Sequence, residues 1–373
     1  MSPVPAPSVF TFYRDSPQRR AALAEPPGAP ERYQLFGLDE LVARGLRIRH
    51  NLELPGPRPA TARVAGKALN RAVRLAGGYG GDFAGVLACR RDANAADVVL
   101  STVDTVGIPV LALKAVKLVR PPLVYVSIGL LPRLVGLEGR PAVRAYKRVL
   151  RDAAAVVAFG AREAEELREW LGGGRVHFVP FGVDTEQFRP TARPPEVDVL
   201  SVGADPRRDF QLLLRVAERN PDTTFRAVVS AEHARELRVP GNVEVETDIP
   251  FAAMRERLAT ARVVALPVRE NAYSGATTVL LQAMAAGKPV VVSRTSAIAD
   301  GYRLVDGENC RLAPPGDTEA FERAIVDLLG DGEATAAIGS RARETVERHL
   351  SWERYVDSLH GLLTEAALRH SRP

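Results

Sequence analysis

The sequence predicts an α/β chain of two Rossmann-like domains that face a central cleft. Its 373 residues are about two to three times the size of a common domain. Hydrophobic residues make up 46% of the chain and charged residues 25%, as in ordinary globular proteins. Short β-branched runs alternate with longer amphipathic segments, and this alternation is typical of βα units around parallel sheets.

The first alternating series contains five candidate strands and two clear helices. Three consecutive glycines, 172–174, end the second helix, because glycine accepts the left-handed backbone that closes a helix. The expected strands are Val9–Phe12, Val98–Thr102, Leu123–Ser127, Ala154–Phe159 and Val176–Val179, and the expected helices are Arg140–Arg151 and Ala161–Leu171.

A proline-rich segment, 180–195, predicts a linker to a second series. We therefore expect domains at 1–184 and 185–350, followed by a final amphipathic segment, Trp352–Leu368, within 351–373. The second series comprises the expected strands Val197–Val202, Thr224–Val229, Val243–Glu246, Val263–Pro267 and Pro289–Ser293, and the expected helices Phe210–Glu218, Phe251–Thr260, Gly275–Ala286, Thr318–Leu329 and Glu333–His349.

Composition argues against several classes of protein. No apolar run reaches the roughly 18 uncharged residues of a membrane span, and no secretory signal follows Met1, so we expect a cytoplasmic protein. Cys89 and Cys310 lie far apart and fit neither a metal site nor a disulfide framework. The six histidines form no compact ligand set, so we expect no metal.

Basic residues concentrate in the first half of the chain. Residues 1–182 carry 26 Lys and Arg against 16 Asp and Glu, a net charge of +10, and the rest carry 24 against 29, a net charge of −5. An anionic partner, or a peripheral contact with an anionic membrane, would fit this half. Lys114, Lys117 and Arg120 recur at helical spacing and could form such a basic face, with a solvated helix as the alternative.

The strongest local signal lies between residues 270 and 289. A buried strand ends near Pro267, a polar loop follows, and a helix opens at Ser274 or Gly275, with Ser274 as a candidate N-cap. The unpaired amides of residues 274–277 would lie at the positive end of this helix and suit a diphosphate. A capped helix without a ligand is the alternative.

Further candidates follow other predicted strands. In the loop 201–209, Gly203 permits a tight turn, and Arg207 and Arg208 place positive charge where a phosphate could lie. Both arginines could instead be solvated turn residues. In the first half the glycine-rich loop 77–82, which ends at Asp82, could wrap an acceptor or merely turn the chain. Asp104 and the segment 127–129 follow predicted strands and could face the cleft, with exposure to solvent as the alternative.

Four segments together resemble a GT-B glycosyltransferase, most similar to glycosyltransferase family 4. They are Val176–Pro190, Leu281–Val291, Asp306–Asp317 and Ser351–Arg354, which are similar to the family's interdomain segment, donor-site helix, downstream loop and start of the last helix. The resemblance covers most of the chain. It implies retaining transfer of a sugar from a nucleotide diphosphate sugar to an acceptor, which could be a glycan, a lipid or a small natural product, and a last helix that crosses back to the first domain.

The resemblance also assigns roles. Arg208, with Arg207 as a close competitor, matches the diphosphate-binding position, Gly203 matches the glycine of that loop, and Gln282 matches an acid that contacts the ribose. The remaining matches are Tyr273, Ser274, Gly275, Ala276 and Thr277 for sugar and phosphate, and the backbone of Asp248 and Ile249 for the base. Because the resemblance implies that the first domain holds the acceptor, Asp82, Asp104, Ser127 and Gly129 are the candidates on the acceptor side.

The chain departs from the family's pair of glutamates, since Ser274 and Gln282 occupy those positions. Glu270 just upstream could supply a carboxylate instead. We expect front-face displacement, in which the leaving phosphate takes the acceptor proton while Arg207 or Arg208 and the helix amides stabilise its charge. A nucleotide-sugar epimerase of the same architecture and a non-catalytic nucleotide-binding subunit are the alternatives.

Overall fold

A computed structural model describes residues 6–54, 58–273 and 275–370. Residues 6–159, 163–179 and 356–370 form one compact unit, unit 1, and the remaining described residues form unit 2. Helix α16 (Trp352–His370) begins in unit 2 and continues into unit 1, where Arg44 Nη2 lies 2.8 Å from Asp357 Oδ1. The predicted linker, 180–195, lies within unit 2.

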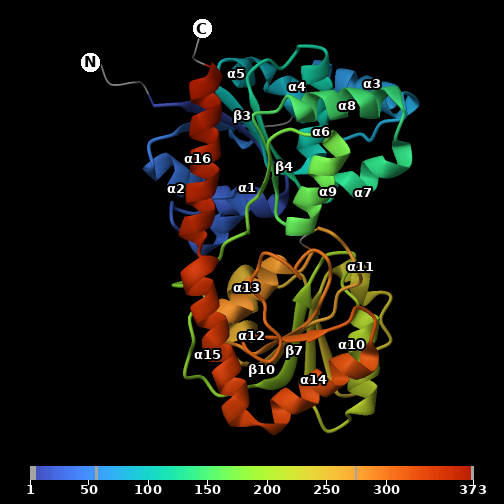
Figure 1. Cartoon of the computed structure of the whole chain (residues 1–373), viewed down its shortest axis with the longest axis vertical. Helices are drawn as coiled ribbons and strands as arrows, with labels where there is room; N and C mark the ends of the chain where they lie inside the picture. Colours follow the sequence, from blue (N-terminus) through green and yellow to red (C-terminus); the bar gives the residue numbers. More distant parts are fainter. Residues whose placement is uncertain (1–5, 55–57, 274, 371–373) are drawn as a thin grey trace. The chain divides into compact units, whose positions relative to one another are not determined.

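Unit 1 is built on a six-stranded parallel sheet with the order β2-β1-β3-β4-β5-β6, and helices cover both of its faces (Figure 1). The central strands are buried throughout, which explains why they read as continuous apolar runs. The strands are β1 (Ser8–Phe12), β2 (Arg47–His50), β3 (Val98–Ser101), β4 (Leu123–Ser127), β5 (Ala155–Ala158) and β6 (Val176–Phe178). The α-helices are α1 (Pro17–Ala24), α2 (Leu38–Ala43), α3 (Ala60–Leu75), α4 (Phe83–Ala88), α5 (Arg90–Asn94), α6 (Asp104–Ala115), α7 (Leu130–Leu134), α8 (Pro141–Arg151) and α9 (Ala161–Leu171).

Unit 2 repeats this architecture with the strand order β12-β11-β10-β7-β8-β9. Its strands are β7 (Val197–Gly203), β8 (Phe225–Val229), β9 (Val243–Thr247), β10 (Ala261–Leu266), β11 (Val290–Ser293) and β12 (Arg311–Ala313). Its helices are α10 (Phe210–Arg219), α11 (Ala231–Ala234), α12 (Phe251–Ala259), α13 (Thr277–Ala285), α14 (Thr318–Gly330) and α15 (Gly332–His349). The predicted class, two parallel-strand Rossmann-like sheets, is therefore confirmed.

Each sheet contains a point at which the strand order reverses. In unit 2 the chain runs outward from β7 to β8 and β9, then returns to place β10 on the other side of β7. In unit 1 the reversal lies between β1 and β3. Ligands of such sheets bind beyond the carboxyl ends of the strands at these points. The loops that follow β7 and β10 are therefore the first place to look for a site in unit 2.

The basic helical face predicted around Lys114 is wrong. Helix α6 ends at Ala115, and Lys117 adopts a left-handed backbone with φ of 59°, so the three cations do not share one helix. Lys114 also turns its ammonium group to the backbone, donating to the carbonyl of Arg120 at 3.2 Å. Among the described residues, no helix is both long enough and apolar enough to cross a membrane.

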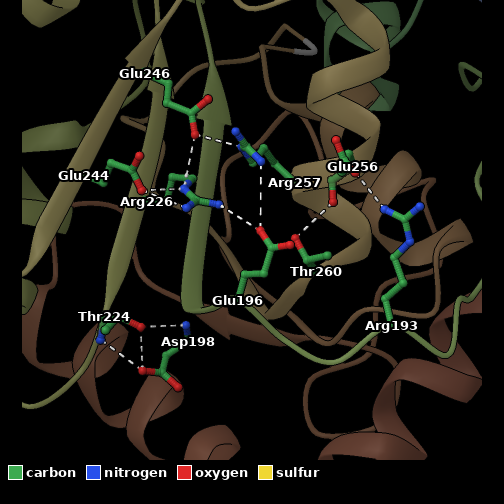
Figure 2. A network of polar contacts seen from close by, with 10 residues as sticks. All are labelled: Arg193, Glu196, Asp198, Thr224, Arg226, Glu244, Glu246, Glu256, Arg257 and Thr260. Carbon is green, nitrogen blue, oxygen red and sulfur yellow. Dashed lines mark hydrogen bonds and ion pairs between the residues drawn. The ribbon is translucent and has the colours of Figure 1, made fainter.

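A network of charged side chains joins β8, β9 and α12 on one surface of unit 2 (Figure 2). Arg226 on β8 lies at its centre, with Nη2 at 2.7 Å from Glu244 Oε2 and Nε at 3.1 Å from Glu246 Oε1. Glu246 also accepts from Arg257 Nε on α12 at 2.8 Å. The network thereby fixes α12 to the strand that precedes the turn at Asp248.

We expect Arg226→Ala to lower the free energy of unfolding by about 1–2 kcal/mol, because the half-buried carboxylate of Glu246 loses one of its two cations. Arg219→Ala is the matched control, since Arg219 has a single, more exposed ion pair with Glu322 and its loss should cost less than about 1 kcal/mol. Urea unfolding at low and high salt measures both. Equal losses in the two variants would contradict a structural role for the network.

Candidate functional site

The two loops at the reversal point of unit 2 are joined through their backbones. After β7, Arg208 forms an antiparallel bridge with Val268, which follows β10. The amide of Asp209 donates to the carbonyl of Pro267 at 2.9 Å, and the amide of Arg269 donates to the carbonyl of Arg207 at 2.8 Å. The two strongest sequence signals therefore do converge, because β7 and β10 are neighbours in the sheet.

Asp205 connects the same two loops through its side chain. Its Oδ1 accepts from the amide of Arg207 at 2.8 Å and from the hydroxyl of Tyr273 at 3.0 Å. A Cβ placed on Gly275 would lie 3.0 Å from the same oxygen, so only glycine leaves Asp205 room. Burial and the Asp205 charge together raise the pKa of Tyr273 to about 12. Sequence reasoning gave Asp205 no role, although its place directly after a buried strand was a usable signal.

Arg208 is the central cation of this arrangement and is only 3% exposed. Its Nη2 donates to Ser201 Oγ at 3.0 Å, and its guanidinium carbon lies 5.5 Å from the ring centre of Phe210. Its Nε and Nη1 are buried and have no hydrogen-bond partner among the described residues. Burial lowers the pKa of Arg208 to about 10, so the group stays charged at neutral pH.

Gly203 leaves room for the guanidinium group of Arg208. A Cβ there would lie 3.0 Å from both the guanidinium carbon and Nη1 of Arg208, and would push the side chain away. Because buried donors are almost always paired, two unpaired nitrogens make this buried cation suited to bind an anion.

Helix α13 begins later than predicted. It starts at Thr277 with Ala276 as its N-cap residue, and within the described residues no side chain caps its first amides. Ser274, the expected N-cap, lies outside the described residues. Thr277 Oγ1 is buried and lacks a hydrogen-bond partner in the described chain. The start of α13 therefore offers backbone amides and a hydroxyl on the same edge of the sheet as Arg208.

Gln282 lies on the same helix and is 3% exposed, so its amide is close to the apolar interior rather than in open solvent. Arg207 and Glu270 differ from Arg208 in being exposed. Glu270 Oε1 accepts from the amide of Ser296 at 2.8 Å, in the loop after β11. The roles predicted for these three side chains remain predictions.

The predicted base-binding residues lie at the same carboxyl edge, two strands from β7. Asp248 directly follows β9 and adopts a left-handed backbone with φ of 50°. Its amide donates to the carbonyl of Val229, the last residue of β8, at 3.4 Å. Since neighbouring strands are about 4.8 Å apart, the turn at Asp248 and Ile249 lies roughly 10 Å from the end of β7 across the sheet.

In unit 1 three of the four acceptor-side candidates meet around one loop. Asp104 is buried at the start of α6, where it accepts from the Tyr125 hydroxyl at 2.8 Å and from the amide of Ile128 at 3.2 Å. Ser127 Oγ and the amide of Gly129 both donate to Glu163 Oε1, at 2.6 and 3.0 Å. Two buried carboxylates thus hold the loop from either side.

Asp82 lies beside this cluster. Its amide donates to the carbonyl of Thr105 at 2.8 Å, and its carboxylate caps α4 by accepting from the amide of Gly85 and pairs with Arg58. The groups of Asp82, Asp104, Ser127 and Gly129 named here therefore bond within unit 1. Any contact with a ligand would use their remaining polar atoms.

Glu163 was missed by sequence reasoning. It belongs to the buried face of α9 together with Ala164, Leu167 and Leu171, and a carboxylate at such a position was the available signal. Burial raises the pKa of Glu163 to about 7, and burial raises the pKa of Asp104 to about 6. Glu163 Oε2 is buried without a hydrogen-bond partner in the described part of the chain.

Within the described residues no three His, Cys, Asp or Glu side chains gather as they would around a metal ion. The expectation of metal-independent chemistry remains a prediction.

Residues 196–331, most of unit 2, match the family Glycosyl transferases group 1. Two curated relatives extend the similarity. The chain is 25% identical over 225 residues to an MMP alpha-(1->4)-mannosyltransferase of Mycolicibacterium hassiacum, covering 57% of this chain and 54% of that protein. It is 28% identical over 247 residues to a GDP-mannose-dependent alpha-(1-6)-phosphatidylinositol monomannoside mannosyltransferase of Mycolicibacterium smegmatis, covering 58% and 64%. The similarity thus spans between about half and two thirds of these relatives.

Solved structures resemble the whole chain. Sucrose-phosphate synthase of Thermosynechococcus elongatus superposes with a TM-score of 0.72 at 16% identity, covering 97% of this chain and 100% of that one. HepE of Anabaena in complex with UDP-glucose gives a TM-score of 0.66 at 15% identity, covering 96% and 99%. This likeness shows the fold, which is that of GT-B glycosyltransferases.

Proposed function

We propose that this chain, whose residues 196–331 match glycosyl transferases group 1, transfers a sugar from a nucleotide diphosphate sugar to an acceptor and retains the anomeric configuration. The buried guanidinium of Arg208 is the observation that carries the proposal. It is a cation with two unpaired donors, located where the strand order of a Rossmann-like sheet reverses. A diphosphate would supply the oxygens that these donors lack.

The rest of the donor fits along the same edge of unit 2. The first amides of α13 and Thr277 would bind phosphate and sugar oxygens, and Gln282 would bind the ribose hydroxyls. The turn at Asp248 and Ile249 lies roughly 10 Å away from β7, a distance that a ribose and the attached base can span.

In this proposal Arg208 acts on the leaving group. Cleavage of the bond between the anomeric carbon and the phosphate oxygen places negative charge on the diphosphate, and a fixed cation stabilises that charge as it develops. The acceptor oxygen attacks from the side of the departing phosphate, which takes the acceptor's proton. Arg207 and Glu270 are exposed nearby on the same two loops. Arg207 would add positive charge beside the diphosphate, and Glu270 would supply a carboxylate.

Titration calorimetry with UDP, GDP and ADP tests the nucleotide site without knowledge of the acceptor. We expect one of the three to bind in the micromolar range, both with and without EDTA, and Arg208→Met to weaken that binding. The rate of turnover of the matching nucleotide sugar is then measured by the release of free nucleotide. NMR determines the anomeric configuration of the product.

The outcomes separate the alternatives. Release of nucleotide with an α-linked product from an α-linked donor supports retaining transfer. A rearranged sugar formed from the donor alone would favour an epimerase, and binding without turnover across a mixed acceptor library would favour a nucleotide-binding subunit. Failure of all three nucleotides to bind contradicts the proposal.

A further inference from the structure

Helix α3 presents an unusual surface to solvent in unit 1. It packs on α4 through its buried residues Ala62 and Gly66, and a Cβ added to Gly66 would lie 2.8 Å from the backbone nitrogen of Ala84. On the opposite side Val64 is 70% exposed and Leu75 is 80% exposed, the highest values among the large hydrophobic side chains that the structure describes. The two residues are eleven positions apart, so they point within about 20° of one another. They form an apolar ridge along the helix.

Cations flank this ridge on one side only. Four exposed cations lie beside it: Arg63, Lys67, Arg71 and Arg74. At 3.6 residues per turn, these cations and the ridge together occupy about 120° of the circumference of the helix. The chain between Leu54 and Gly81 contains no Asp or Glu. Arg58 pairs with Asp15 and Asp82, whereas the four cations of α3 form no ion pair with any carboxylate of the described residues. Their charge is therefore not neutralised within the chain.

The turn after α3 adds an exposed aromatic ring and two arginines. Tyr79 is 43% exposed, and the guanidinium of Arg133, which is also exposed, lies 5.3 Å from the centre of its ring. Arg140 follows closely, since its side chain lies against Gly77 at the turn after α3. An aromatic ring with a phenol group beside arginines is typical of side chains at the boundary between lipid and water.

We propose that this face of α3 binds the surface of an anionic lipid bilayer. Val64 and Leu75 would enter the boundary between headgroups and acyl chains, and the four cations would meet lipid phosphates beside them. The apolar ridge favours lipid over nucleic acid, because phosphates of a nucleic acid would leave Val64 and Leu75 in water. The inference goes beyond sugar transfer and does not depend on it.

Sedimentation with vesicles tests the proposal. The full chain should sediment with vesicles of phosphatidylcholine and phosphatidylglycerol in equal parts, bind pure phosphatidylcholine much more weakly, and be released as NaCl rises from about 0.1 to about 0.5 M. Replacing Arg63, Lys67, Arg71 and Arg74 together with glutamine should reduce binding at least about 100-fold. Val64→Ser with Leu75→Ser should reduce it about tenfold or more while leaving the charge unchanged.

The matched control replaces Arg90, Arg91, Lys117 and Arg120 with glutamine. These exposed cations also belong to unit 1, their loss changes the net charge by the same amount, and two of them come from the basic face predicted from sequence. The control should keep nearly full binding. Circular dichroism and thermal melting establish that all variants fold.

Three results would overturn the proposal. Equal loss in the control variant would show attraction by net charge alone. Tighter binding to a single-stranded oligonucleotide than to the anionic vesicles would assign the face to nucleic acid. A dimer that Val64→Ser and Leu75→Ser dissociate, without any vesicle binding, would assign it to a second copy of the chain.

Discussion

Replacing Arg208 with methionine is expected to lower the rate of sugar transfer by about 10²–10³-fold and, at the same time, to raise the free energy of unfolding by about 1–3 kcal/mol. The rate falls because the leaving diphosphate loses a preorganised cation. Stability rises because the unliganded protein holds Nε and Nη1 buried without hydrogen bonds, and methionine fills a similar volume without that cost. Turnover of the nucleotide sugar and urea unfolding of the ligand-free protein measure the two effects.

Arg32 provides the matched control, since it is another buried arginine with every nitrogen paired. Its Nε and Nη2 each lie 2.5 Å from a carboxylate oxygen of Asp39, and its Nη1 donates to three backbone carbonyls between Ala22 and Glu25. Arg32→Met should therefore lower the free energy of unfolding by about 3–5 kcal/mol, because it leaves the Asp39 carboxylate without its cation.

The opposite signs of the two effects on stability are the informative result. A fall in stability on Arg208→Met, comparable with that of Arg32→Met, would mean that Arg208 serves the fold of unit 2. Arg208→Lys refines the result, because lysine keeps the charge but cannot offer two parallel donors to a diphosphate, so part of the activity should survive.

The sequence predicted the central strands well because burial on both faces leaves a clear mark. β3, β4, β5 and β10 are apolar at nearly every position, and this pattern arises only where helices cover both sides of a sheet. Edge strands leave a weaker mark: β6 and β9 were predicted, whereas β2 and β12 were not. β2 was missed because its sequence, Arg-Ile-Arg-His, alternates an exposed cation with partly buried residues.

The sequence predicted where the two loops of the candidate site lie, but it did not predict the side-chain contacts that support them. The convergence of the two loops could be predicted because parallel strands end at the same edge of a sheet. Gly203 and Arg208 were identified because glycine permits a tight turn and arginine carries a positive charge. The pairing of Asp205 with Tyr273, and of Glu163 with Ser127, joins residues 68 and 36 positions apart. Such contacts follow from the packing of loops and helices, which a single sequence does not encode in any local period.

The pH dependence of stability in unit 1 provides the second large effect. Burial, with smaller contributions from Asp104 and Glu166, raises the pKa of Glu163 from 4.5 to about 7, although hydrogen bonds from Ser127 and Gly129 act in the other direction. The folded state therefore binds the Glu163 proton more tightly than the unfolded chain does. Its contribution to stability is complete below pH 4.5 and is lost as the pH rises toward 7.

Glu163→Gln should remove this dependence, because glutamine resembles the protonated acid and its Oε1 can still accept from Ser127 and Gly129. We expect the variant to match the parent protein near pH 4.5 and to exceed its free energy of unfolding by about 3 kcal/mol at pH 8. Urea unfolding at a series of pH values measures the difference between the two proteins, in which the contributions of groups that do not interact with Glu163 cancel.

Glu169→Gln is the control, since Glu169 lies exposed on the same helix and its loss changes the net charge equally. The difference in free energy of unfolding between Glu169→Gln and the parent protein should stay small at every pH. A Glu163→Gln variant that is less stable than the parent protein at pH 8 would contradict the argument, because it would mean that the ionised carboxylate, held by Ser127 and Gly129, stabilises the loop. The sign of that one difference therefore decides whether the loop 127–129 is held by a neutral acid or by a charge.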